Sequence, residues 1–192
     1  MQSTTALAPI ELGHGPTELE IFLEPTCPFS KRAFEKLPQL VAAVGPDKLT
    51  VKIRFVSQPW HLFSGIVTRS ILATSATKGG TEAALKAMAA VFEHREDFEF
   101  ENHSSGPNMH RTPSDIIADI SRLTGVELSD AFKLKSVDTA LRWHTKYTRQ
   151  NGIHVSPTFM INGLVEPAMS SGQDVQEWAK LLAPPVGPSG SA

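Results

Sequence analysis

The hydrophobic pattern of the first sixty residues predicts a strand, a helix and a second strand. Apolar residues nearly alternate over 19–24 and alternate clearly with charged residues over 50–57, as is typical of strands. Between them, residues 28–44 place their apolar side chains on one helical face. Pro38 predicts a kink in that helix, and Gly45 predicts its end. A strand–helix–strand unit of this length predicts two parallel strands joined by a right-handed crossover.

The middle of the chain, residues 60–151, has a helical period throughout. Thr112, Pro113 and Asp115 form a start signal, because a threonine cap, a proline in the first position and an acid three residues after the cap favour a helix. A polar, glycine- and histidine-containing stretch at 96–109 predicts a loop. The expected helices are 62–78, 81–94, 113–124 and 136–150, with a short helical turn at 129–134.

The two ends of the chain complete the predicted architecture. Strands at 158–161 and 164–165 flank Asn162-Gly163, a two-residue hairpin signal, and a helix is expected at 173–182. Residues 1–17 read as an extended arm with an edge strand near 10–12, and residues 184–192 as a disordered tail. We therefore expect an α/β domain formed by 18–59 and 152–183, with a helical insert at 60–151.

Composition excludes several classes of function. The chain has 192 residues and a formal net charge of −2, which does not favour nucleic acid or an anionic membrane. No apolar run approaches the ~20 residues of a membrane span, and the first residues lack a secretory signal pattern. A single cysteine excludes an intrachain disulfide. We expect a cytoplasmic protein, with a processed periplasmic form as the alternative.

That cysteine, Cys27, lies where the first strand gives way to the helix. Pro28 suits the first helical position, because its missing N–H would have no intrahelical partner. The thiol therefore lies beside unpaired N–H groups and the positive end of a helix dipole, and both favour the thiolate. The expected donors are the backbone N–H groups of Phe29 and Ser30 and the Ser30 hydroxyl. Lys31 and Arg32 follow and are expected to face solvent.

A strand, then Cys27-Pro28-Phe29-Ser30, then a helix, resembles the active-site segment of the thioredoxin superfamily. Ser156-Pro157-Thr158 before an apolar strand resembles its second conserved element, and the long helical middle resembles the DsbA-like branch. The resemblance implies a thioredoxin-like fold with the order βαβ, helical insert, ββα. It also implies a cis Pro157 that turns the preceding backbone toward Cys27, where it can pair with a peptide or with glutathione.

Ser30 departs from the family pattern, because dithiol enzymes have their second cysteine there. A serine hydroxyl cannot resolve a mixed disulfide on Cys27, so an external thiol such as glutathione must do so. We therefore expect a thiol–disulfide oxidoreductase or isomerase with Cys27 and Ser30 as its catalytic residues and no permanently bound cofactor. The residues expected to contact substrate are Pro28, Phe29, Ser156, Pro157, Thr158 and His154.

Two other functions remain open. The chain also resembles kappa-type glutathione transferases and chromene-carboxylate isomerases, in which a serine at the helix start activates glutathione; Ser30 would then outweigh Cys27. The other alternative is a non-catalytic binding module with an inert buried cysteine. The expected partners are a thiol- or disulfide-containing protein or glutathione, and a homodimer bridged through Cys27 is possible.

The histidines and the segment after the second predicted strand are weaker candidates for functional residues. His103 and His110 lie in a loop without metal-ligand spacing, so we expect no metal site. His154 is a candidate base or charge partner for Cys27, because it comes two residues before Ser156. Trp60 and His61 line either a substrate groove or a packed linker.

Overall fold

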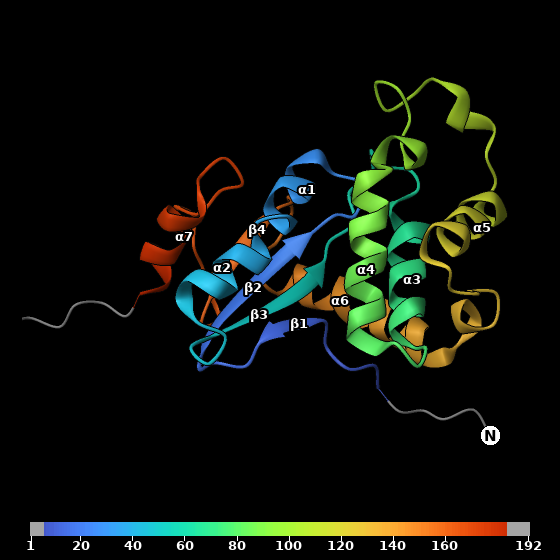
Figure 1. Ribbon diagram of the computed structural model, residues 1–192. Helices are drawn as coiled ribbons and strands as arrows, with labels where there is room; N and C mark the ends of the chain where they lie inside the picture. The colour runs from blue at the N-terminus through green and yellow to red at the C-terminus, as the bar shows by residue number, and fades with distance from the viewer. Residues whose placement is uncertain (1–5, 184–192) are drawn as a thin grey trace, which may run out of the picture.

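A five-stranded mixed sheet with helices on both faces forms the centre of the molecule (Figure 1). The structure is a computed structural model, which describes residues 6–183. The sheet order is β1-β3-β2-β4-β5, with β2 and β3 parallel and the other neighbours antiparallel. The predicted βαβ unit and the C-terminal ββα unit are both present. The strands are β1 (Glu11–Gly13), β2 (Thr17–Leu23), β3 (Leu49–Phe55), β4 (Thr158–Ile161) and β5 (Leu164–Val165).

Seven α-helices and three short 3-10 turns surround this sheet in the described part of the chain. The helices are α1 (Pro28–Phe34), α2 (Leu37–Val44), α3 (Ser64–Ser75), α4 (Gly80–Glu93), α5 (Pro113–Thr124), α6 (Lys135–Gln150) and α7 (Val175–Leu182). The 3-10 turns are η1 (Arg95–Phe98), η2 (Pro107–His110) and η3 (Ala131–Lys133). The predicted loop at 96–109 thus contains two of these turns, and the predicted turn at 129–134 contains the third.

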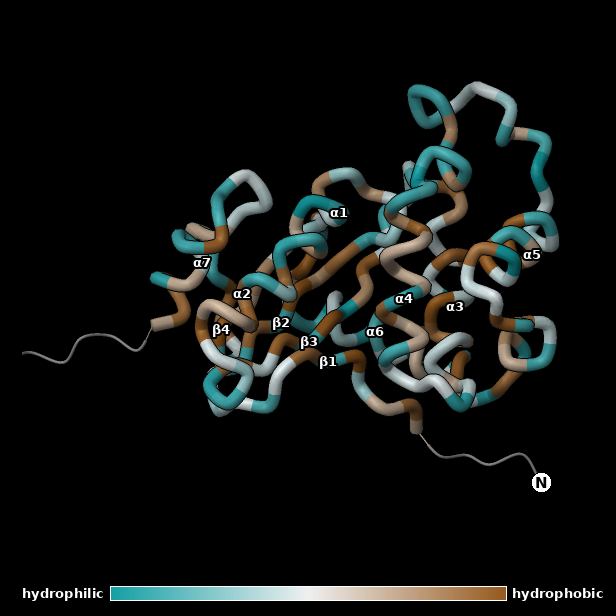
Figure 2. The backbone as a smooth tube through the Cα atoms, viewed as in Figure 1, coloured by the Kyte–Doolittle hydropathy of each residue, from teal (hydrophilic) through white to brown (hydrophobic). Residues whose placement is uncertain are grey.

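The alternation along β2 divides its side chains between two buried faces. Leu19, Ile21 and Leu23 join the main core with α7 and with α2, which lies in front of the sheet in Figure 1. Phe22 points the other way, into a smaller cluster with Tyr147 of α6. In Figure 2, hydrophobic colour predominates along β2, and hydrophilic colour is common on the outer loops. Burial on both faces explains why β2 is almost continuously apolar.

Pro38 has a larger effect than the predicted kink. The helix expected over 28–44 is divided into α1 and α2, and Lys36 donates its N–H to Ala33 across the break. A proline at 38 cannot donate to the carbonyl of Phe34, four residues earlier, so the helical ladder loses a bond there. The second helix ends at Gly45, as predicted, with a positive φ of 109°.

The helical insert shares one core with the sheet. Ile71 of α3, Met88 of α4 and Ile116 of α5 belong to the same buried cluster as Leu19 and Val51 of the strands. The capping box predicted at the start of α5 is present, with the Thr112 and Asp115 side chains each bonding the other residue's backbone. The insert is therefore packed against the sheet as part of one domain.

The described part of the N-terminal arm runs into the sheet. Ile10 is buried and β1 pairs with β3, which agrees with the expected edge strand near 10–12. The predicted tail at 184–192 lies outside the described residues. Within residues 6–183, no helix combines the length and the apolar character needed to cross a membrane.

Candidate active site

Cys27 occupies the position just before the first turn of α1. Its N–H donates to Glu24 O at 3.1 Å, and its carbonyl accepts the Lys31 N–H at 3.0 Å. Pro28 takes the first helical position, as the sequence predicts. The N–H groups of the first turn have no intrahelical acceptor, so they lie at the end of the helix that Cys27 occupies. Only 3% of Cys27 is exposed, which leaves a narrow approach to its sulfur.

The loop before β4 faces Cys27 from far along the sequence. Cys27 Sγ lies 3.8 Å from the Ser156 carbonyl oxygen, the distance of a weak S–H···O contact. The Ser156–Pro157 peptide bond is cis. Ser156 Oγ donates to Gln58 Oε1 at 2.9 Å, and Gln58 is buried in the segment that follows β3. Gln58 therefore holds the loop that faces the sulfur.

Ser30 is completely buried one turn into α1. Its hydroxyl oxygen accepts the N–H of Glu24 at 3.1 Å, so it ties the helix to the end of β2. The hydroxyl hydrogen is left to serve as a donor. Donation from Ser30 to the Cys27 sulfur remains a prediction.

A chain of buried polar groups lies next to Cys27. Glu24 Oε2 accepts from both the N–H and the hydroxyl of Thr26, at 2.9 and 2.8 Å. Thr26 Oγ1 is also 3.0 Å from His61 Nδ1. Since the single hydroxyl hydrogen of Thr26 goes to Glu24, the imidazole Nδ1 must be the donor to Thr26. Thr26, the residue before Cys27, is thereby fixed on both its backbone and its side chain.

Glu99 and Arg95 extend this chain from the region after α4. Glu99 Oε1 lies 3.4 Å from His61 Nδ1, Arg95 pairs with Glu99, and Arg95 Nη1 donates to Thr26 O at 3.4 Å. Burial raises the pKa of Glu24, and the charge of His61 only partly offsets it. Burial alone would lower the pKa of His61, but Glu99 and Glu24 outweigh it and raise the pKa overall. The cluster thus favours retention of a proton beside the active-site turn.

The structure brings some of the predicted site residues together and leaves others apart. Cys27, Ser30 and Ser156 lie at one place, and Pro28 is exposed beside them. Phe29 is 50% exposed, with the Arg32 guanidinium 4.7 Å above its ring.

The remaining residues that the sequence analysis assigned to the site make no side-chain hydrogen bond to Cys27 among the described residues. Thr158 donates to Val155 O within the same loop, at 2.7 Å. Lys31, half-exposed, pairs loosely with Glu35, while Arg32 is exposed as expected. His154 is exposed, so its role as a base or charge partner for Cys27 stays a prediction.

Trp60 and His61 differ in burial, and the expectation that they line a substrate groove stays a prediction. Trp60 is 48% exposed, whereas His61 is buried and bonded to Thr26. His103 lies in the exposed loop, with its ring 5.5 Å from that of His61. No cluster of His, Cys, Asp and Glu suited to a metal occurs among residues 6–183.

The sequence reasoning missed five residues of this site: Glu24, Thr26, Gln58, Arg95 and Glu99. Glu24 looks like the polar end of a strand, and Gln58 and Glu99 like loop residues. One signal was available, because a carboxylate that follows a buried apolar strand and precedes the cysteine by three positions needs a partner to be buried.

The chain is similar to several solved structures. It is 56% identical to a candidate protein-disulfide isomerase from Pseudomonas syringae, over 91% of this chain and 97% of that one, with a TM-score of 0.89. DsbA2 from Pseudomonas aeruginosa is 15% identical over 96% and 100% of the two chains, with a TM-score of 0.63. The thiol-disulfide exchange protein α-DsbA2 from Wolbachia pipientis is 16% identical over 91% and 85%, also with a TM-score of 0.63.

The two distant structures establish the fold, and the close one extends the match to the sequence. No protein-family model and no curated protein matches the chain. The chain belongs to the DsbA-like thiol–disulfide oxidoreductases, enzymes with a thioredoxin-like fold and a helical insert.

Proposed function

We propose that this protein catalyses thiol–disulfide exchange through Cys27 alone, with an external thiol such as glutathione completing each cycle. The main support for this proposal is the position of the single cysteine, at the start of α1 and 3.8 Å from the Ser156 carbonyl oxygen. In addition, a serine, Ser30, occupies the position where a resolving cysteine would lie. The family performs this class of chemistry, and the single-cysteine route is our proposal for this member.

The cycle has two exchanges of sulfur partners. The Cys27 thiolate attacks a substrate disulfide; a Cys27–substrate disulfide forms, and the other substrate sulfur leaves as a thiolate that takes a proton from solvent. A second thiolate then attacks the substrate sulfur of this mixed disulfide and releases Cys27. If that thiolate belongs to the substrate, the net result is isomerisation. If it belongs to glutathione, the substrate leaves as a mixed disulfide with glutathione.

Exposed apolar side chains around Cys27 support a polypeptide substrate. Phe29 follows the cysteine, Val155 precedes Ser156, and Trp60 and Leu62 flank His61, with exposed fractions between 48% and 60%. Each belongs to a segment that contributes to the site. An extended peptide with apolar side chains would bury these groups while its backbone pairs with the loop at 155–156.

The placement of Ser30 favours this mechanism over activation of glutathione by serine. Ser30 is completely buried, and its hydroxyl accepts from the Glu24 backbone. A glutathione sulfur could not reach that hydroxyl without displacing part of α1, whereas Cys27 lies just before the helix and keeps 3% of its surface exposed. Because the cycle consumes a reduced thiol, we also propose that it operates in a reducing compartment such as the cytoplasm.

The test is a mass-spectrometric search for the mixed disulfide. Wild-type protein treated with oxidised glutathione should gain one glutathione adduct, and Cys27→Ala should gain none. In an isomerisation assay on a scrambled disulfide protein, turnover should require added reduced glutathione or a substrate thiol. Ser30→Cys, which restores a resolving thiol, should remove the accumulated adduct.

Two results would oppose the proposal. Isomerisation that persists in Cys27→Ala would exclude the cysteine as nucleophile. Glutathione-dependent turnover of a small molecule by Cys27→Ala, lost in Ser30→Ala, would instead establish the serine mechanism.

A further inference from the structure

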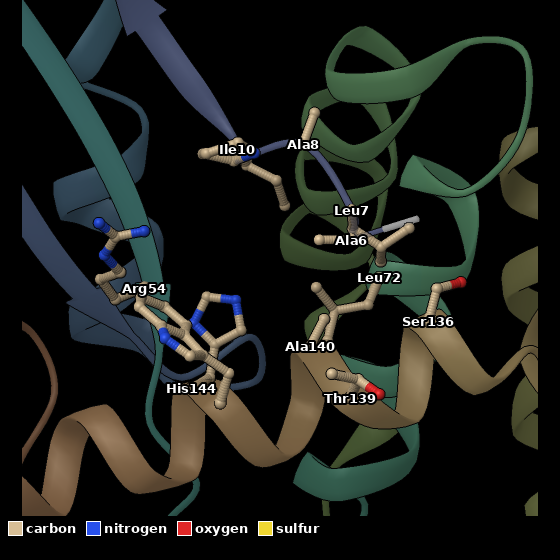
Figure 3. Close-up of a pocket in the computed structure, with 12 residues that line it drawn as sticks. Ala6, Leu7, Ala8, Ile10, Arg54, Leu72, Ser136, Thr139, Ala140 and His144 are labelled. Atoms are coloured by element: carbon tan, nitrogen blue, oxygen red, sulfur yellow. The ribbon is translucent and has the colours of Figure 1, made fainter. Parts of the chain in front are cut away.

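A cavity of about 310 Å³ opens between the N-terminal segment, β3 and α6 (Figure 3). Its walls are mostly apolar and include Ile10, Leu72 of α3 and Ala140 of α6. None of the residues that surround Cys27 lines it. A volume at the lower end of the range for ligand pockets, about 300–1,000 Å³, suits a small molecule rather than a peptide.

His144 supplies a polar group to this otherwise apolar space. The residue is only 8% exposed, and Figure 3 shows its imidazole turned toward the space between Ile10 and Ala140. His144 Nδ1 accepts the backbone N–H of Phe55 at 3.3 Å, so the ring hydrogen belongs on Nε2. Among residues 6–183, His144 Nε2 is not one of the fully buried polar atoms left without a partner. Because His144 lines the cavity, its Nε2–H is open to that space, where a ligand oxygen can accept its hydrogen bond.

The charges of the cavity favour a negatively charged ligand. Arg54 lies on its wall, and none of the twelve lining residues is an aspartate or a glutamate. The Arg54 guanidinium stacks on Trp143 at 4.8 Å, and its Nε pairs with Glu20, which does not line the cavity. Burial, together with the positive charge of Arg54, lowers the pKa of His144 to about 3, so the imidazole is a neutral donor at pH 7.

We propose that this cavity is a binding site for a small carboxylate with an apolar body. One carboxylate oxygen accepts from His144 Nε2–H on the side of the cavity near Arg54, and the apolar body lies against Ile10, Leu72 and Ala140. Ser136 and Thr139 add hydroxyls to the wall nearer the start of α6, away from the His144 imidazole. This site is separate from the proposed exchange site and does not depend on Cys27.

The experiment is a titration of the full chain with benzoate and 3-phenylpropionate, followed by amide NMR shifts and tryptophan fluorescence. We expect saturable binding, with shifts on α6 and β3 around Trp143 and His144. The uncharged isostere benzamide should bind about tenfold more weakly, because a charge-assisted hydrogen bond is roughly twice as strong as a neutral one. The Cys27→Ala variant should bind as the wild type does.

Two substitutions on α6 block the site in different ways. Ala140→Leu fills the cavity, and Thr139→Phe covers its mouth from an exposed position that leaves the core untouched. Each should weaken benzoate binding by about tenfold or more, since the apolar body loses its burial. Lys146→Leu, exposed on the same helix and outside the cavity, is the matched control and should change the affinity less than twofold.

Several outcomes would overturn the proposal. One is that neither benzoate nor 3-phenylpropionate saturates the protein up to its solubility limit. Another is that benzoate and benzamide bind with equal affinity. A third is that the Thr139→Phe variant binds benzoate as tightly as the wild type. Shifts confined to the surroundings of Cys27 would assign the carboxylate to the exchange site instead. Since glutathione adduct formation at Cys27 is measured separately, failure of this site leaves the proposed exchange reaction intact.

Discussion

Thr26→Val is the sharpest test of how the site is held together. Valine has nearly the shape of threonine, but it lacks the hydroxyl that donates to Glu24 at 2.8 Å and accepts from His61 at 3.0 Å. The backbone N–H of Thr26 still donates to Glu24, and His61 still has Glu99 within 3.4 Å. The substitution therefore removes one link of the buried chain and changes little else.

The expected cost follows from the two hydrogen bonds that the hydroxyl loses. Each contributes about 1 kcal/mol, so the free energy of unfolding should fall by about 2 kcal/mol. For a domain of this size, such a loss lowers the melting temperature by about 4–8 °C. Urea unfolding followed by tryptophan fluorescence measures the first quantity, and thermal unfolding followed by circular dichroism the second.

Thr26→Ser is the matched control, because it keeps the hydroxyl and loses only a methyl group, about 0.8 kcal/mol of buried apolar surface. The valine variant should therefore be less stable than the serine variant, and it should form the Cys27–glutathione adduct more slowly, because the turn before Cys27 has lost an anchor. Equal stability of the two variants, or a valine variant as stable as the wild type, would refute the role assigned to the hydroxyl.

Three further predictions concern the same fold. Because the folded pKa of His61 is raised, its stabilisation is complete below its ordinary value of 6.5 and is lost as the pH rises through the folded value; the unfolding free energy should fall across that interval, and His61→Gln should flatten the curve. Gln58→Leu removes the acceptor of Ser156 and should cost about 1 kcal/mol and slow exchange, whereas Gln58→Glu should retain the bond; equal exchange rates in both would contradict this. Asp174→Ala breaks the capping box with Glu177 and should cost about 1 kcal/mol in urea unfolding, with Asp174→Asn close to the wild type.

Most of the architecture could be predicted from the sequence because its signals are local. The alternation in β3 and the capping residues of α5 depend on a few consecutive side chains, and both predictions are confirmed. Helix ends were less well placed. The helix predicted over 62–78 spans Ser64–Ser75, because Phe63 turns inward to the core before the first helical residue.

The polar chemistry of the site could not be predicted in the same way. Thr26 and His61 are 35 positions apart, and Cys27 and Ser156 are 129 apart, so no periodicity connects them. The family resemblance indicated that Ser156 would lie near Cys27. It said nothing of Glu24, whose burial depends on partners that only the folded chain supplies.

The shared core of sheet and insert has a consequence for how such enzymes diversify. His61, Arg95 and Glu99 reach the turn before Cys27 from the inserted region, while Cys27 itself comes from the sheet domain. A chimera that takes only residues 60–151 from a relative would thus keep Cys27 and Glu24 and exchange the segment that supplies His61, Arg95 and Glu99. Transplanting that segment offers a route to retune one sulfur without mutating the strand or the helix that carries it.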